Sequence, residues 1–208
     1  GRDCCFYYGF RYYDVNVTNR AISNDVGDAT TISGNILAGR NAHIDVWGAL
    51  SITGDVTAIS PNIDAVKYFY ADSGRVYIHN FGKASGNTTT ITGNVYGYDY
   101  VDIRNYGQIN SHLNISGNVK TADGGLHVVS YGDLQLGQVD SGRWIDIGVY
   151  GLRSDLNGPV TANGDVFYQA PIAQTNLKPA AVITGDSVEL QVRNFRGVNA
   201  SGLRDSSA

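Results

Sequence analysis

Two stretches decide the fold: VYIHNFG at residues 76–82 and VDIRNYG at residues 101–107. In each, two apolar residues flank a polar one, and an aromatic residue followed by glycine closes the segment. Alternation with a period of two is typical of a β-strand, because successive side chains face opposite sides of a sheet. The pattern returns at 126–132 and 145–151, with a shortened copy at 44–48 and a lengthened one at 190–197.

A second motif alternates with the first, and it reads Ile or Leu, then Ser or Thr, then Gly and Asn or Asp. From its glycine to the glycine of the next first motif the spacing is nearly constant, as from Gly34 to Gly48 and from Gly93 to Gly107. The spacing onward to the next copy varies, as expected where a loop tolerates insertion. Clear and weaker copies lie at 32–36, 52–56, 91–95, 115–119, 136–139 and 183–186.

These repeats predict an all-β, single-domain parallel β-solenoid of about seven turns, each about 19–25 residues long. The count takes residues 54–92 as two turns, and a right-handed β-helix is expected by analogy. No turn can bury its own apolar face, so neighbouring turns must stabilise one another. We expect an aromatic and cysteine-containing N-terminal segment and cap at 1–29, solenoid repeats at 30–198 and a flexible tail at 199–208.

Composition narrows the classes of function. The net charge of −4 gives no basic footprint for nucleic acid, so no nucleic-acid partner is expected. No run of apolar residues approaches the ~18 needed for a membrane-spanning helix, so we expect no membrane insertion. The chain contains no Met, even at position 1, so we expect a processed or excised chain.

The polar residue between each apolar pair should face solvent. Equivalent positions then form an exposed column, which is the candidate ligand surface: Asp45, Tyr77, Asp102, His127 and Asp146. The aromatic residues before the corner glycines should form a second column, either as a platform for sugar rings or, as we favour, as corner packing: Trp47, Phe81, Tyr106, Tyr131 and Tyr150. A side-chain ladder could link the corners through Asn35, Asp55, Asn94, Asn118 and Gln138.

Catalytic signatures are scarce. The four His residues lack metal-binding spacing, and the sequence contains neither a nucleophile elbow nor a phosphate-binding loop. Asp45, Asp102 and Asp146 are the strongest acid candidates, but the repeat places them several turns apart. We therefore expect no enzyme, no catalytic residue, no metal and no cofactor, and keep a polysaccharide lyase or hydrolase as an alternative.

The N-terminal segment differs from the repeats. Cys4 and Cys5 are the only cysteines, and adjacent residues close only a strained ring. They are therefore candidates for disulfides between chains, and free thiols are the alternative. The aromatic residues that follow form a candidate assembly strand that could cap the solenoid or dock on a neighbour: Phe6, Tyr7, Tyr8, Phe10, Tyr12 and Tyr13. Docking would produce a head-to-tail homo-oligomer or fibre, because a heterologous contact does not close on itself.

The recurring Ile-[Ser/Thr]-Gly-Asn-Val, as at 91–95 and 115–119, resembles the repeats of filamentous-haemagglutinin-like exoproteins. The resemblance covers roughly residues 30–168 and implies a right-handed β-helix with a structural or adhesive role at the cell surface. We therefore expect a secreted, extracellular structural protein, a self-assembling subunit of a fibre or surface layer. The alternative is an adhesin module that binds surface glycans or a host.

Overall fold

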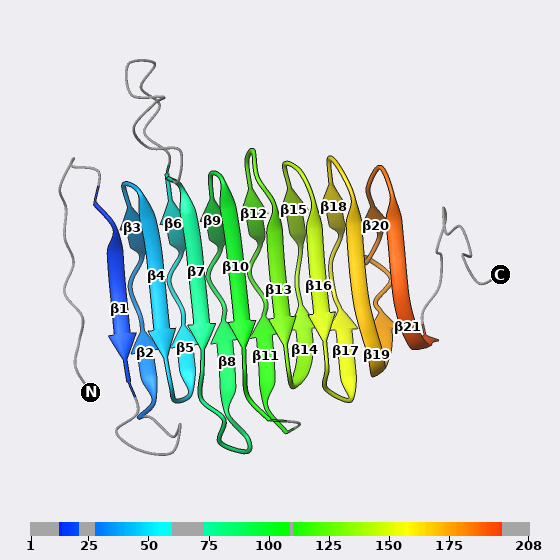
Figure 1. Cartoon of the computed structure of the whole chain (residues 1–208), viewed down its shortest axis with the longest axis horizontal. Coiled ribbons are helices and arrows are strands. Elements are labelled where there is room, and N and C mark those ends of the chain that lie inside the picture. Colours follow the sequence, from blue (N-terminus) through cyan, green and yellow to red (C-terminus); the bar gives the residue numbers. More distant parts are fainter. Residues whose placement is uncertain (1–12, 21–27, 60–72, 109, 197–208) are drawn as a thin grey trace.

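The computed structural model describes residues 13–20, 28–59, 73–108 and 110–196. Every regular element in these ranges is a β-strand, and the strands coil into three faces, as Figure 1 shows. Each turn contributes one strand to each face, and we call these three strands a rung. Because every strand pairs in parallel with its equivalent in the next rung, the expected parallel β-solenoid is confirmed, with about seven turns.

The first face carries the first sequence motif. Its strands are β1 (Val15–Asn19), β4 (Asn41–Val46), β7 (Arg75–Asn80), β10 (Tyr100–Asn105), β13 (Leu126–Ser130), β16 (Ile145–Val149), and the first parts of β19 (Val166–Leu177) and β21 (Val188–Arg196).

The second face precedes the glycine of the second motif. Its strands are β2 (Thr30–Ile32), β5 (Leu50–Ile52), β8 (Thr88–Ile91), β11 (His112–Ile115), β14 (Asp133–Leu136), β17 (Arg153–Leu156) and the last parts of β19 and β21. Since β19 runs without a break from the first face to the second, the two faces are joined in one sheet.

The third face is a separate sheet of seven short strands. These are β3 (Ile36–Ala38), β6 (Val56–Ala58), β9 (Val95–Gly97), β12 (Val119–Thr121), β15 (Val139–Ser141), β18 (Val160–Ala162) and β20 (Ile183–Thr184).

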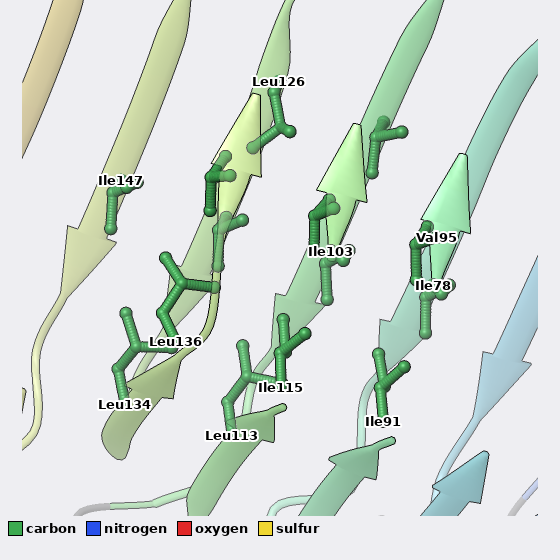
Figure 2. Close-up of a cluster of buried hydrophobic side chains, with 14 of the residues drawn as sticks. Ile78, Ile91, Val95, Ile103, Leu113, Ile115, Leu126, Leu134, Leu136 and Ile147 are labelled. Atoms are coloured by element: carbon green, nitrogen blue, oxygen red, sulfur yellow. The ribbon is translucent and has the colours of Figure 1, made fainter. Parts of the chain in front are cut away.

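The core is the column of apolar side chains that the three faces direct inward. Ile78, Ile91 and Val95 come from three strands of one rung, and each is almost fully buried. Figure 2 shows that such trios repeat along the axis, with equivalent side chains lying above one another. Stacking of equivalent apolar side chains removes them from water. Each Å² of apolar surface buried in this way stabilises the coil by about 25 cal/mol.

Two boundaries differ from expectation. Ile52 pairs directly with Ile91, so residues 54–92 belong to one turn rather than two. The sequence alone misleads here because 16 residues separate β6 from β7, where the other rungs have two to four, and this turn becomes about as long as two. Near the N-terminus, Val15–Asn19 lies inside the segment expected to form the N-terminal cap. It forms β1 and pairs in parallel with β4. The tail at 199–208 lies outside the described residues.

The close approach of successive corners after the second face explains the glycine of the second motif. A Cβ on Gly93 would lie 2.0 Å from the carbonyl oxygen of Gly54, and one on Gly54 would lie 2.2 Å from that of Gly34. Successive corners are therefore in backbone contact, and close approach rather than a positive φ requires glycine here.

A ladder of Asn and Asp side chains links the same corners. The side-chain Oδ1 of Asn35 accepts from the Asp55 amide at 2.9 Å, and Asp55 Oδ1 accepts from the Asn94 amide at 2.7 Å. Asn94 Oδ1 then accepts from the Asn118 amide at 3.1 Å. The predicted ladder is confirmed over these four residues, while the Gln138 side chain makes no such bond to any residue in the described ranges.

Candidate functional site

The outward side of the first face gathers most of the ionisable side chains singled out from the sequence. Tyr77, Asp102, His127 and Asp146 are paired in register on β7, β10, β13 and β16, so these four form the predicted column. Asp45 does not belong to it, because Asp45 pairs with His79 and the residue opposite Tyr77 is His43.

The error over Asp45 has a simple origin. The apolar pair of β4 is Ala42 and Ile44, which lie opposite Val76 and Ile78, rather than Ile44 and Val46. Alanine is a weak signal for an inward position, and without it the segment resembles a shortened copy of the motif. Aligning the segments on the aromatic residue and glycine at their ends would have placed His43 in the column.

Five side chains form what we call the acid–imidazole line, in which carboxylates and imidazoles alternate across five rungs: Asp45, His79, Asp102, His127 and Asp146. The Nδ1 of His79 lies 3.4 Å from Asp45 Oδ1, and its Nε2 lies 3.4 Å from Asp102 Oδ2. The latter nitrogen is buried and not aligned for a hydrogen bond. On the other side, His127 Nδ1 lies 3.1 Å from Asp102 Oδ1 and its Nε2 lies 3.6 Å from Asp146 Oδ2.

Asp102 is the centre of the line, and its side chain is only 5% exposed. Arg104, two residues along β10, donates through Nε to Asp102 Oδ1 at 2.8 Å and also reaches Oδ2 at 3.0 Å. Burial alone raises the pKa of Asp102, but contacts with His127, His79 and Arg104 outweigh it and hold the pKa well below its ordinary value. The hydrogen bond to Asp102 in turn raises the pKa of Arg104.

Tyr100 lies beside this cluster on β10. Burial, together with the negative charge of Asp102, raises the pKa of its phenol to about 12. The hydroxyl is therefore protonated at neutral pH and can act as a hydrogen-bond donor, not as a phenolate base.

The geometry of the acid–imidazole line favours a structural role over acid–base catalysis. Glycoside hydrolysis needs two carboxyls about 5–10 Å apart with the scissile bond between them. Here His127 occupies the space between Asp102 and Asp146, and His79 occupies the space between Asp45 and Asp102. The low pKa of Asp102 also makes that group a poor proton donor at neutral pH.

The aromatic residues before the corners form a continuous stack along the same face, which we call the aromatic ladder. Ring centroids are 4.8 Å apart for Trp47 and Phe81, 5.2 Å for Phe81 and Tyr106, 5.6 Å for Tyr106 and Tyr131, and 5.2 Å for Tyr131 and Tyr150. Each pair is stacked, so the ring faces of the inner members contact one another. A sugar ring could reach only their edges, and the ladder supports corner packing over a saccharide platform.

Some residues of this face were not recognised from the sequence. His79 and Arg104 lie in the column next to the predicted one and turn their side chains toward Asp102. His43 stacks on Tyr77 with ring centroids 4.7 Å apart. The signal for these residues was present, because positions two residues apart on a strand share one face.

Most of the candidate assembly strand and both cysteines lie outside the described residues: Cys4, Cys5, Phe6, Tyr7, Tyr8, Phe10 and Tyr12. Tyr13 is described, and it is 61% exposed just before β1.

Within the described ranges, no group of three or more His, Cys, Asp or Glu is placed to hold a metal ion. The part of the chain that the structure describes also contains no helix long and apolar enough to cross a membrane. No family model, curated protein or solved structure matches the chain.

Proposed function

We propose that the protein is an extracellular structural subunit whose solenoids stack head to tail into a fibre or surface layer. The observation that carries this proposal is the match between the two terminal strands, β1 and β21. β1 and the first part of β21 both belong to the first face, run in the same direction as every strand between them, and keep the same inside–outside alternation.

The terminal rungs leave apolar side chains incompletely covered. Val15 and Val17 on β1, and Val188 and Leu190 on β21, are only partly buried. Equivalent positions inside the stack, such as Ile44, are fully buried. Among the described residues, β1 pairs only with β4 and β21 only with β19. Unpaired strand edges with apolar inward residues favour the addition of another strand.

A second copy that continues the ladder would bring compatible residues together. Opposite β21, the β1 strand of the next copy would place Val15 beside Val188 and Val17 beside Leu190. Outside, Glu189 would meet Asn16 and avoid a like-charge pair. Since β1 and β21 are different surfaces, the contact is heterologous and propagates as a fibre instead of closing as a dimer.

The location outside the cell rests on the resemblance of the repeats to those of surface exoproteins. Cys4 and Cys5 would then lie in an oxidising environment, close in sequence to β1, and would link neighbouring copies covalently. This link would lock a junction that strand pairing has already formed.

Two single substitutions test the junction. Val17→Lys places a charge among the inward residues of β1, and Leu190→Lys does the same on β21. Each variant alone should remain monomeric, while the wild type forms filaments in negative-stain electron microscopy. An equimolar mixture should form dimers and nothing larger, because only one intact β1 edge and one intact β21 edge remain to meet.

The matched control is Thr18→Lys, an outward and exposed position on the same strand. It should assemble like the wild type. Dimers of Leu190→Lys alone would indicate a symmetric contact between β1 edges and would contradict head-to-tail stacking. Discrete single solenoids of the wild type at every concentration would refute the proposal as a whole.

A further inference from the structure

Not every aromatic side chain on the first face belongs to the aromatic ladder. Trp144 immediately precedes β16 and is 40% exposed, although tryptophan is costly to leave in water. Its ring does not stand out from the surface. Instead it lies back over the neighbouring rung, where Gly125 leaves the space of a missing side chain.

The contact with Gly125 defines the orientation of the indole. A Cβ on Gly125 would lie 2.2 Å from Cε2 of Trp144, 2.5 Å from Cζ2 and 2.7 Å from Cδ2. Cε2 is a ring-fusion atom, bonded to three ring atoms in the plane, so it can be the nearest atom only if the approach is from above the plane. One face of the indole is therefore pressed on Gly125, and its exposed area belongs to the opposite face and the edges.

The backbone that carries the indole is fixed by hydrogen bonds, and a second ring packs against the indole. The backbone carbonyl of Trp144 accepts hydrogen bonds from the Leu126 amide at 2.9 Å and from the Ser141 hydroxyl at 2.9 Å. Tyr100 contacts the indole at a tilt, with ring centroids 5.9 Å apart. A preorganised aromatic surface loses little entropy on binding.

Hydrogen-bonding groups border the platform. Asp146 lies on the same side of the same strand, about 7 Å along it, and its side chain is 41% exposed. A carboxylate has about four acceptor sites, so Asp146 can accept bonds from neighbouring hydroxyls while contacting His127. Asp165, whose carbonyl accepts from the Ile145 amide, is exposed on the next rung.

From this geometry we propose that Trp144, Asp146 and their surroundings form a binding site for an uncharged saccharide. The C–H groups on one side of a pyranose ring carry slight positive charge and match the negative face of an indole. Adjacent hydroxyls of the same sugar donate to a carboxylate such as Asp146. The carboxylates of Asp146 and Asp165 disfavour a sugar acid. This site is independent of the assembly contact at β1 and β21.

The chain offers a direct optical test because it contains only two tryptophans. Trp47→Phe keeps an aromatic ring in the ladder and leaves Trp144 as the single reporter. The probe is cellohexaose, a neutral oligosaccharide, added to the wild type and to this variant. We expect a saturable change in tryptophan fluorescence in both, with a Kd of about 1 mM for a single shallow platform.

Two variants separate the site from the fold. Trp144→Ala removes the platform, and Gly125→Ala displaces it while keeping the indole. Binding in both is followed by calorimetry and should weaken by about tenfold or more, with an unchanged circular dichroism spectrum. An oligoglucuronate of the same length should bind more weakly than cellohexaose.

Three results would overturn the proposal. The first is the absence of saturable binding by cellohexaose and by neutral hexamers of mannose, galactose and N-acetylglucosamine up to about 10 mM. The second is unchanged affinity in Trp144→Ala. The third is tighter binding of oligoglucuronate than of every neutral hexamer. None of these results depends on filament formation, so failure of this site and failure of the assembly proposal are distinguishable.

Discussion

His127 Nδ1 lies 3.1 Å from Asp102 Oδ1, and the two residues occupy equivalent positions on adjacent rungs, β13 and β10. The contact joins two rungs through their outward side chains, in addition to the backbone ladder between them. Asp102 is thereby a buried charge on the outer surface of a solenoid, covered by its own partners.

Removing Asp102 should therefore cost more than removing a neighbouring carboxylate. Asp102→Ala leaves Arg104 and His127 without their shared partner, and we expect the free energy of unfolding to fall by about 3 kcal/mol. Asp146→Ala is the matched control, since its side chain is 41% exposed, and should cost less than about 1 kcal/mol. Urea unfolding followed by circular dichroism measures both, and equal losses would contradict a central part for Asp102.

Acid should remove the same stabilisation. An unfolded Asp titrates near pH 3.9, and the pKa of Asp102 in the folded protein is lower. The unfolded state therefore binds more protons as the pH falls, so the contribution is present above about pH 5 and declines below it. The urea midpoint of the wild type should fall more steeply from about pH 6 to pH 3 than that of Asp102→Asn. Parallel curves would show that Asp102 is not responsible.

The glycine corners should not tolerate a methyl group. In Gly93→Ala the new Cβ would lie 2.0 Å from the Gly54 carbonyl oxygen, and successive rungs would have to separate. We expect a loss of more than about 3 kcal/mol or failure to fold, above the usual range for overpacking. Gly86→Ala is the control. A Cβ at position 86 would meet nothing within 4 Å, so only the backbone φ of +77° opposes the substitution. That substitution should cost about 1 kcal/mol in the same unfolding assay.

Stacking in the aromatic ladder should be measurable as a coupling energy. Phe81 and Tyr106 have ring centroids 5.2 Å apart and an interplanar angle of 8°. A double-mutant cycle with Phe81→Leu and Tyr106→Leu should give a coupling of about 1 kcal/mol. The pair Phe81 and Tyr150 is the control, since Tyr106 and Tyr131 separate them. Additive losses for the adjacent pair would mean that the rings contribute only by burial.

The cysteines provide a prediction that depends on sequence alone. Cys4 and Cys5 should form disulfides between copies, so non-reducing electrophoresis should resolve dimers and larger species that reductant converts to the 22.3 kDa chain. Cys4→Ser combined with Cys5→Ser should run as a monomer under both conditions. A monomeric wild type without reductant would exclude the covalent link but leave strand stacking untouched.

Much of this architecture follows from the repeats. A parallel coil places the same position of each turn in the same environment, so a residue pattern that recurs along the chain becomes a column in space. The inward column of Ile78, Ile103 and Val128, the ladder of corner Asn and Asp, and the stack of aromatic rings were all predicted on this basis. Because equivalent residues stack on one another, these columns can be predicted from the sequence.

Features that do not repeat in every turn depend on contacts between rungs. Alanine is common on both sides of a strand, so Ala42 does not mark an inward position in the sequence. Only the strand pairing shows that Asp45 lies opposite His79. The insertion before β7 makes one turn about as long as two. Only the pairing of Ile52 with Ile91 shows that it is a single turn.

Sequence by itself determined the solenoid, because period-two alternation and glycine corners act locally and repeat in every turn. The tertiary structure alone decided the acid–imidazole line and the platform of Trp144. In both, the outcome depends on a side chain that leans from its own rung onto the next. His79 and His127 reach carboxylates on both sides, and Trp144 fills the space left by Gly125. Such contacts arise from rotamers and neighbouring volumes, and no residue pattern within a single turn specifies them.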